Sequence, residues 1–192
     1  MVTGLLNFAC WAQRHTYRKE KEKIMNELQD ERNVLPPILD ACCGPKGMWF
    51  NKSDSRVLYM DKRRETIHMQ YPSGNYTEII NPDLLLDFAS MPFQDETFHM
   101  VVFDPPHITQ KKPIGRIVKR YGHLAGEWQE MLKNGFSECF RVLKPNGTLI
   151  FKWNECRIPV KEILALTDHA PLFGHKSGKT MQTHWICFMK EA

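Results

Sequence analysis

The chain has 192 residues, a formal net charge of +4, 42% hydrophobic residues and 25% charged residues. This length and composition fit one globular domain with a full core. No stretch approaches the roughly 20 apolar residues that span a bilayer. The N-terminus lacks a secretory pattern, and the six cysteines show no C-x-x-C spacing. We therefore expect a cytoplasmic protein with reduced thiols, no membrane partner and no bound metal.

The predicted elements alternate between helical and extended segments. The chain opens with a helical segment, residues 1–35, which is rich in helix formers and ends before Pro36-Pro37. Short apolar runs predict strands at ILDAC (38–42), RVLYMD (56–61), TEII (77–80), HMVVFD (99–104), TLIFKW (148–153) and THWICFMK (183–190). Helical spacing predicts helices over 127–143 and 160–167. This alternation predicts a single α/β domain over 1–192, with a mostly parallel sheet and helices on both faces.

A glycine-bearing turn follows the first predicted strand. Residues 38–47 read ILDACCGPKG, and glycine at such a turn permits positive φ and a close approach of the backbone to a ligand. The stretch is neither a G-x-G-x-x-G fingerprint nor a phosphate loop. A plain tight turn therefore stays open as an explanation of this stretch alone.

Acidic residues stand at the ends of successive predicted strands. Asp40 stands near the end of the first, and Asp61 ends the second, about 20 residues after the glycine turn, where an acid can accept hydrogen bonds from ribose hydroxyls. Asp87 is followed by Phe88, an acid and a ring suited to an adenine amino group and the purine face. A helix cap or a surface acid would explain each one alone, but three in this order are less easily explained that way.

Together these segments resemble the class I S-adenosylmethionine-dependent methyltransferases over about residues 38–153. DACCGPKG resembles the family's first motif, D-x-G-x-G-x-G, and Asp61 matches its ribose acid. DFASMPFQDETF resembles D-x-x-x-L-P-F-x-D-x-x-F, and RVLKPNGTLIF resembles the helix, turn and fifth strand that follow. The tail, 170–190, suits the sixth and seventh strands. The resemblance is greatest to the small methyltransferases of bacteriophages and prophages, which act in a bacterial host cell.

This resemblance implies a Rossmann-like methyltransferase fold with a seven-stranded, mostly parallel sheet and an antiparallel last strand. It implies S-adenosyl-L-methionine as the cofactor. The cofactor-binding residues that it implies are Asp40, Cys42, Gly44, Gly47, Asp61, Lys62, Asp87 and Phe88. The sequence departs from the family pattern at Cys42, where a glycine is usual, at Lys46, where a small residue is common, and at His99, where an acid is frequent.

The strand HMVVFD runs into Asp104-Pro105-Pro106-His107, which resembles the [D/N/S]-P-P-[Y/F/W/H] motif of amino methyltransferases. An exocyclic amino group is a poor nucleophile because its lone pair is delocalised. The Asp104 carboxylate and the Pro105 carbonyl could accept its two N–H bonds, since proline fixes the direction of the carbonyl beforehand. The His107 ring could stack on the base. The resemblance thus implies that Asp104, Pro105, Pro106 and His107 are catalytic, although D-P-P alone is also a common turn sequence.

A basic run follows, KKPIGRIVKRYGH (111–123), inside a predicted substrate loop over 108–126. Charge runs are usually solvated loops, but its position beside the acid-proline motif favours contact with phosphates. The substrate-binding residues predicted from it are Lys111, Lys112, Arg116, Lys119, Arg120 and Tyr121.

The sequence therefore predicts an N-methyltransferase that acts on an exocyclic amino group of a nucleobase, adenine N6 in DNA or RNA. Nucleic acid is the expected partner, and the oligomeric state is open. One alternative is an enzyme that acts on a protein amide or a small molecule. Another is a non-catalytic nucleic-acid-binding module, motivated by Cys42 and Lys46. The chain lacks room for a separate target-recognition domain, and a short basic loop reads few bases.

Overall fold

The computed structural model describes residue 19 and residues 35–71, 74–109, 116–124 and 126–192. The predicted N-terminal helical segment therefore lies outside the described residues, apart from its positions 19 and 35. The same holds for positions 110–115 and 125 of the predicted substrate loop.

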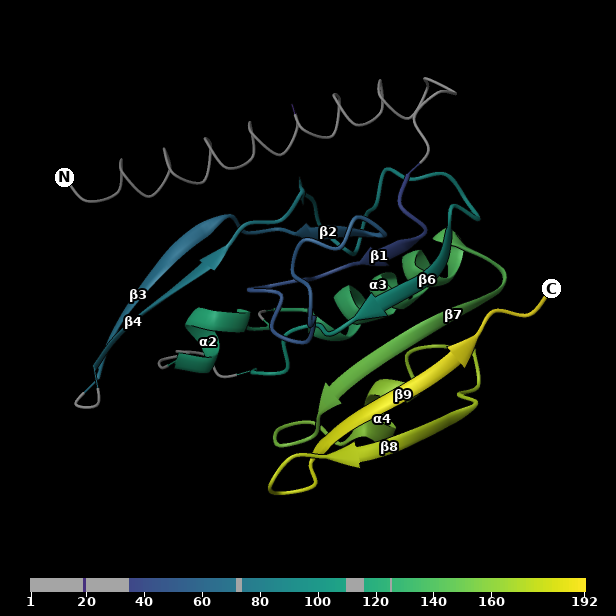
Figure 1. The fold of residues 1–192 in the computed structure, drawn as a ribbon. Coiled ribbons are helices and arrows are strands. Elements are labelled where there is room, and N and C mark those ends of the chain that lie inside the picture. The colour runs from purple at the N-terminus through teal and green to yellow at the C-terminus, as the bar shows by residue number, and fades with distance from the viewer. Residues whose placement is uncertain (1–18, 20–34, 72–73, 110–115, 125) are drawn as a thin grey trace.

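Seven strands form one sheet in the order β5-β2-β1-β6-β7-β9-β8 (Figure 1). The strands are β1 (Ile38–Asp40), β2 (Val57–Asp61), β5 (Leu84–Leu85), β6 (Phe98–Phe103), β7 (Leu143–Asn154), β8 (Phe173–Ser177) and β9 (Thr183–Met189). The first five strands of the order pair in parallel, and β9 runs antiparallel to both β7 and β8. The predicted fold class, a mostly parallel seven-stranded sheet with an antiparallel last strand, is confirmed.

Two of the three helices described between strands were predicted, and the third, α2 (Arg116–Tyr121), forms inside the predicted substrate loop over 108–126. The other two are α3 (Trp128–Val142) and α4 (Val160–Leu164). The helix predicted over 127–143 forms as α3, and the one predicted over 160–167 forms as the shorter α4. The KPNG turn that was expected before the fifth strand lies within β7, where Asn146 adopts a positive φ of 61°.

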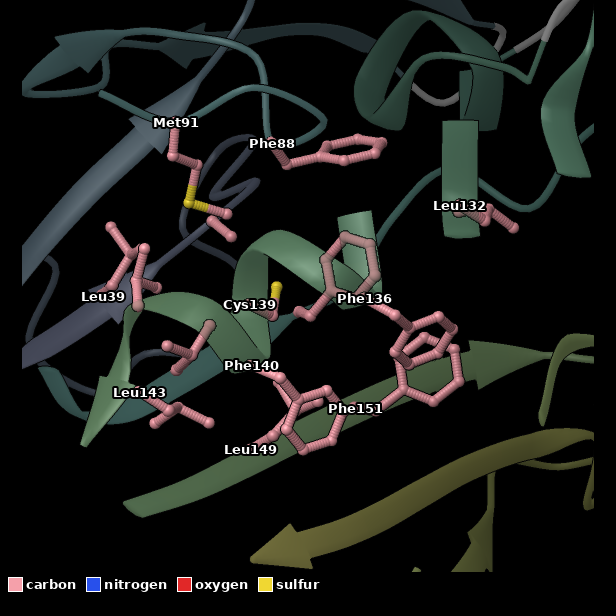
Figure 2. Close-up of a cluster of buried hydrophobic side chains, with 14 of the residues drawn as sticks. Leu39, Phe88, Met91, Leu132, Phe136, Cys139, Phe140, Leu143, Leu149 and Phe151 are labelled. Carbon is pink, nitrogen blue, oxygen red and sulfur yellow. The ribbon is translucent and has the colours of Figure 1, made fainter. Parts of the chain in front are cut away.

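The main core lies between α3 and the central strands. Phe136, Cys139 and Phe140 recur at helical spacing and are buried on one side of α3. Figure 2 shows these side chains beside Leu149 and Phe151 of β7, which alternate with less buried residues along that strand. Helical spacing in α3 and alternation in β7 therefore place these side chains in one continuous apolar layer between the helix and the sheet.

Two connections differ from a simple alternation of strands and helices. Residues 41–56, all described, form turns rather than a helix. Between β2 and β5 the chain forms an antiparallel hairpin, β3 (Glu65–Tyr71) and β4 (Gly74–Ile80). The TEII run therefore belongs to this separate hairpin, and the short β5 takes the expected place of that run in the central sheet.

Candidate active site

A cavity of about 270 Å³ lies where the neighbouring strands β2, β1 and β6 end. Its lining includes eight residues that the sequence singled out: Cys42, Gly44, Asp61, Lys62, Phe88, Asp104, Pro106 and Tyr121. Ala41, Arg63, Gly122, His123 and Met131 complete it. The carboxyl ends of parallel strands are the usual ligand site of such sheets. The fold therefore brings the glycine turn and the acid-proline motif to one cavity, although they are some 60 residues apart in the chain.

The glycine turn is held in a left-handed conformation. Gly44 has a φ of +50°, and Lys46, where the family pattern has a small residue, has a φ of 55°. That conformation costs a residue with a side chain roughly 1–2 kcal/mol. The Lys46 ammonium lies 3.8 Å from the Tyr59 ring centroid and 3.8 Å from a carboxylate oxygen of Asp83, contacts that offset part of this cost.

Asp61 is buried at the end of β2 and connects the turn to α2. One carboxylate oxygen accepts a hydrogen bond from the Gly44 N–H at 2.8 Å, and the other accepts one from the Arg63 N–H at 2.9 Å. The Arg63 guanidinium also donates to the backbone carbonyls of Lys119 and Arg120 at 3.1 and 3.2 Å. Arg63, which no sequence motif indicated, holds the end of α2 beside Asp61.

Asp40 lies behind the turn rather than in the cavity lining. It is fully buried, and its oxygens accept hydrogen bonds from the indole N–H of Trp49 at 2.7 Å and from the Cys42 N–H at 3.3 Å. Burial raises the pKa of Asp40 to about 7, although both hydrogen bonds oppose the rise. Asp40 therefore holds the turn in shape through its hydrogen bonds with Cys42 and Trp49.

Two other predicted cofactor residues lie outside the cavity lining. Asp87 is half-buried and accepts a hydrogen bond from the Ala89 N–H at 3.0 Å, within its own turn. The neighbouring Phe88 ring does line the cavity and packs edge-on against Phe103 at 5.1 Å between centroids. Gly47 is exposed. A β-carbon added at Gly47 would lie 3.5 Å from the Arg120 guanidinium.

Asp104, directly after β6, forms an ion pair that no sequence motif indicated. Lys152 donates from its ammonium to Asp104 Oδ2 at 2.6 Å. The register of β6 and β7, which sets Phe103 opposite Phe151, brings the two following residues together. Burial raises the pKa of Asp104, and the ammonium of Lys152 opposes that rise.

The rest of the acid-proline motif surrounds this pair. Pro106 lines the cavity, whereas Pro105 is buried and His107 is half-buried, both outside the lining. The His107 ring lies edge-on to the Trp153 ring, with 6.3 Å between centroids. Burial lowers the pKa of His107, which favours the neutral imidazole.

The basic run is described only in part. Lys111 and Lys112 lie outside the described residues, and for Arg116 only the backbone is described. Lys119 is exposed. Arg120 forms an ion pair with Glu78 of the hairpin at 2.8 Å, and Tyr121 lines the cavity. Of these residues, Arg120 and Tyr121 lie against the glycine turn. They can therefore shape the cavity in addition to making the predicted contact with substrate.

Within the described part of the chain, no group of three or more His, Cys, Asp or Glu side chains is arranged to hold a metal ion. The same part contains no helix that is both long and apolar enough to cross a membrane.

Strand order, the antiparallel β9 and the cavity at the strand ends define the class of protein as one with a Rossmann-like methyltransferase fold. No family model and no curated protein matches the chain.

Among solved structures, the chain is similar to the PH0226 protein from Pyrococcus horikoshii OT3, with 16% identity over 91% of each chain and a TM-score of 0.49. It is similar to a TehB-like SAM-dependent methyltransferase from Corynebacterium glutamicum, with 14% identity over 87% of each chain and a TM-score of 0.49. A third is the 16S rRNA (adenine(1408)-N(1))-methyltransferase from Catenulisporales acidiphilia, with 10% identity, 88% of this chain, 92% of the other and a TM-score of 0.44. Because these TM-scores are below 0.5, the fold assignment depends on the strand order of the chain itself.

Proposed function

We propose that the protein is an S-adenosylmethionine-dependent N-methyltransferase that acts on an exocyclic amino group of a nucleobase, adenine N6 in DNA or RNA. One observation carries the proposal: a single cavity is lined by Gly44 and Asp61 on one side and by Asp104 and Pro106 on the other. The first pair suits a nucleoside cofactor, and the second suits a planar amino group. The proposal places the protein with the phage and prophage enzymes of this class, in the cytoplasm of a bacterial host.

The cofactor side of the cavity fits S-adenosylmethionine. Asp61 can accept hydrogen bonds from ribose hydroxyls, because each carboxylate oxygen has a second lone pair beyond its present backbone partner. Gly44 has no side chain to fill the cavity, and the Phe88 ring forms an apolar part of its wall. Burial raises the pKa of the Cys42 thiol, so this departure from the family pattern presents a small neutral group. When bound, the cofactor supplies an electrophilic methyl group on a sulfonium.

The acceptor side can activate an amino nitrogen by hydrogen bonding. Because Lys152 holds Oδ2 of Asp104, we assign Oδ1 to accept one N–H of the amino group. The Pro105 carbonyl accepts the other, and together the two acceptors favour a pyramidal nitrogen with its lone pair available. Ionised Oδ1 can also take the proton that the nitrogen loses after methyl transfer. The proposal assigns stacking on the base to the ring of His107, which burial favours in its neutral form and which lies next to the cavity-lining residue Pro106 in the chain. Such positioning lowers a barrier by roughly 7–11 kcal/mol in the best cases.

The test is transfer of a labelled methyl group to separate DNA and RNA pools, followed by nucleoside mass spectrometry. We expect N6-methyladenine in one pool and no product from an Asp104→Ala control. If calorimetry shows cofactor binding but neither pool is labelled, a nucleobase is not the acceptor. Label that persists in protein after nuclease treatment of a cell extract would instead support a protein amide as the acceptor.

A further inference from the structure

The β3–β4 hairpin leaves the body of the molecule beside the cavity. It begins at Glu65, four residues after Asp61, and Lys62 and Arg63 of the connecting segment line the cavity. Figure 1 shows the hairpin as a twisted ribbon that extends away from the seven-stranded sheet. Seven residues per strand give it a length of roughly 20 Å. The ribbon therefore projects from the rim of the cavity.

The two faces of this ribbon differ sharply. On the inner face Ile67, Met69 and Ile80 are buried, and Glu78 forms the ion pair that holds Arg120 of α2. On the outer face the register sets Thr66, His68 and Gln70 opposite Ile79, Thr77 and Asn75, and all six are exposed. None of these six is acidic, and five of them can donate or accept hydrogen bonds without a fixed charge. The inner face fixes the ribbon in place, and the outer face presents hydrogen-bonding groups to the surroundings.

A basic groove lies at the base of the ribbon. It has a volume of about 400 Å³, and three cations and one acid are among its lining residues, which are Pro45, Lys46, Lys52, Glu78, Ile79, Asn81 and Arg120. Two of the three cations are near acids, because Arg120 pairs with Glu78 and the Lys46 ammonium lies 3.8 Å from Asp83. Lys52 is exposed at the groove.

The groove also adjoins the cavity. Lys46 belongs to the same turn as Gly44, and Arg120 precedes Tyr121, a residue of the cavity lining. A phosphate bound in the groove would therefore be separated from the cavity by the glycine turn and the end of α2. Cations that hold phosphates set the position of a nucleic acid, and uncharged polar groups that reach base edges read its sequence.

We propose that this ribbon and groove form a binding surface for duplex DNA, with the outer face of the ribbon in the major groove. The major groove of B-form DNA is about 12 Å wide and admits a two-stranded ribbon. The deep, narrow major groove of an RNA helix does not. Lys52 contacts the backbone, and His68, Gln70 and Asn75 face the base edges. The role of the cavity, which would receive a base flipped from this duplex, rests on the proposed function.

The surface is tested by binding, without methyl transfer. Fluorescence anisotropy compares a DNA duplex of about 20 base pairs with an RNA duplex of the same sequence. We expect the triple variant His68→Ala, Gln70→Ala, Asn75→Ala to bind the DNA duplex about tenfold more weakly and the RNA duplex unchanged. Gln129→Ala, at an exposed glutamine of α3, is the matched control and should bind as the wild type does.

A charge variant tests the groove separately. Lys52→Glu should weaken binding of the DNA duplex at low salt by about tenfold and reduce the slope of log affinity against log salt by about one or two. Lys133→Glu changes an exposed lysine of α3 and should leave the slope close to that of the wild type. An unchanged slope for Lys52→Glu would remove the groove from the interface.

The ribbon inference fails if the folded triple variant binds duplex DNA as tightly as the wild type, or if the wild type prefers the RNA duplex. If the triple variant does not fold, Gln70→Ala alone decides the matter, since that side chain is exposed. A dimer in light scattering that the triple variant abolishes would assign the ribbon to a second copy of the chain and overturn the proposal. Ribbon-dependent DNA binding without any methyl transfer would overturn the proposed function and leave the DNA-binding surface standing.

Discussion

The two sides of the cavity hold their carboxylates in different ways. On the cofactor side, Asp61 accepts hydrogen bonds from two backbone N–H groups, and Asp40 accepts them from an indole and a backbone N–H. On the acceptor side, Asp104 receives a hydrogen bond from one charged side chain, the ammonium of Lys152. Backbone and indole donors hold the first side, where the Arg63 guanidinium also lies 3.6 Å from an Asp61 oxygen, and a 2.6 Å ion pair with Lys152 holds the second.

This difference fits a structural role for the carboxylate of Asp40 and the proposed chemical role for that of Asp104. Backbone donors are fixed by the fold, so they hold the glycine turn in one geometry, but without a cation beside it Asp40 has a pKa raised to about 7. An ammonium opposes the effect of burial on Asp104 while occupying one oxygen. Asp104 thus has an oxygen available for an amino group, as the proposed chemistry requires.

The largest expected effect is from Asp104→Ala. Loss of this acceptor should remove about half of what positioning supplies, so turnover should fall about 10³- to 10⁴-fold. Cofactor affinity, measured by calorimetry, should stay near the wild-type value. Asp61→Ala is the matched loss of a carboxylate on the cofactor side and should weaken cofactor binding instead. Full activity in Asp104→Ala would place the chemistry elsewhere.

Lys152→Met tests the ion pair itself. Removing the ammonium leaves a buried carboxylate without its charged partner, so the free energy of unfolding should fall by about 3 kcal/mol near pH 8. Because Lys152 opposes the rise in the pKa of Asp104, the variant should have a still higher pKa there, and the loss should shrink as the pH falls and Asp104 takes up a proton. Urea unfolding at several pH values measures this.

Activity gives a second reading of the same variant. The acidic limb of the rate profile should move to higher pH in Lys152→Met, because the carboxylate is then ionised only at higher pH. Lys133→Met, at an exposed lysine of α3, is the control and should move neither stability nor the profile. A limb at the wild-type position would mean that Lys152 does not govern the ionisation of Asp104.

Local patterns predicted most of the residues around the cavity. Short stretches in which an apolar strand ends on an acid, a glycine or a proline contain Cys42, Gly44, Asp61, Asp104 and Pro106. Each stretch can be identified in the sequence, but their assembly around one cavity cannot. They meet because parallel strands end at one edge of the sheet. The same reasoning placed Asp87 with them, but its carboxylate is directed into its own turn.

What the sequence could not supply depends on long-range register. Lys152 stands between Phe151 and Trp153 as an ordinary alternating position, and only the pairing of β7 with β6 brings it to Asp104. Arg63 likewise meets α2 across more than 50 residues. The hairpin did leave a local signal, since alternating TIHMQY followed by PSGN is typical of a strand and a turn.

Asp40→Asn tests the structural role of Asp40 through the pH dependence of stability. A pKa raised from 3.8 to about 7 means that the folded protein binds a proton which the unfolded chain releases. The stability from Asp40 is therefore present at low pH and is lost as the pH rises through 7. Between pH 5 and pH 8 the wild type should lose about 2–3 kcal/mol relative to the variant, whose amide does not titrate. If the free energies of unfolding of the two proteins, measured in urea, differ by the same amount at both pH values, the prediction is wrong.

The smallest effect tests the neutral donor directly. Trp49→Phe removes the indole N–H that donates to Asp40 at 2.7 Å, while a phenyl ring can keep the edge-on contact with Tyr59. The loss should be about 1 kcal/mol, the usual net value of one hydrogen bond, and somewhat larger above pH 7, where the carboxylate is ionised. Thermal unfolding at pH 8 compares it with Lys152→Met. A neutral donor that proved as costly to remove as the ammonium would erase the distinction between the two sides of the cavity, because both carboxylates would then depend equally on their single strongest partner.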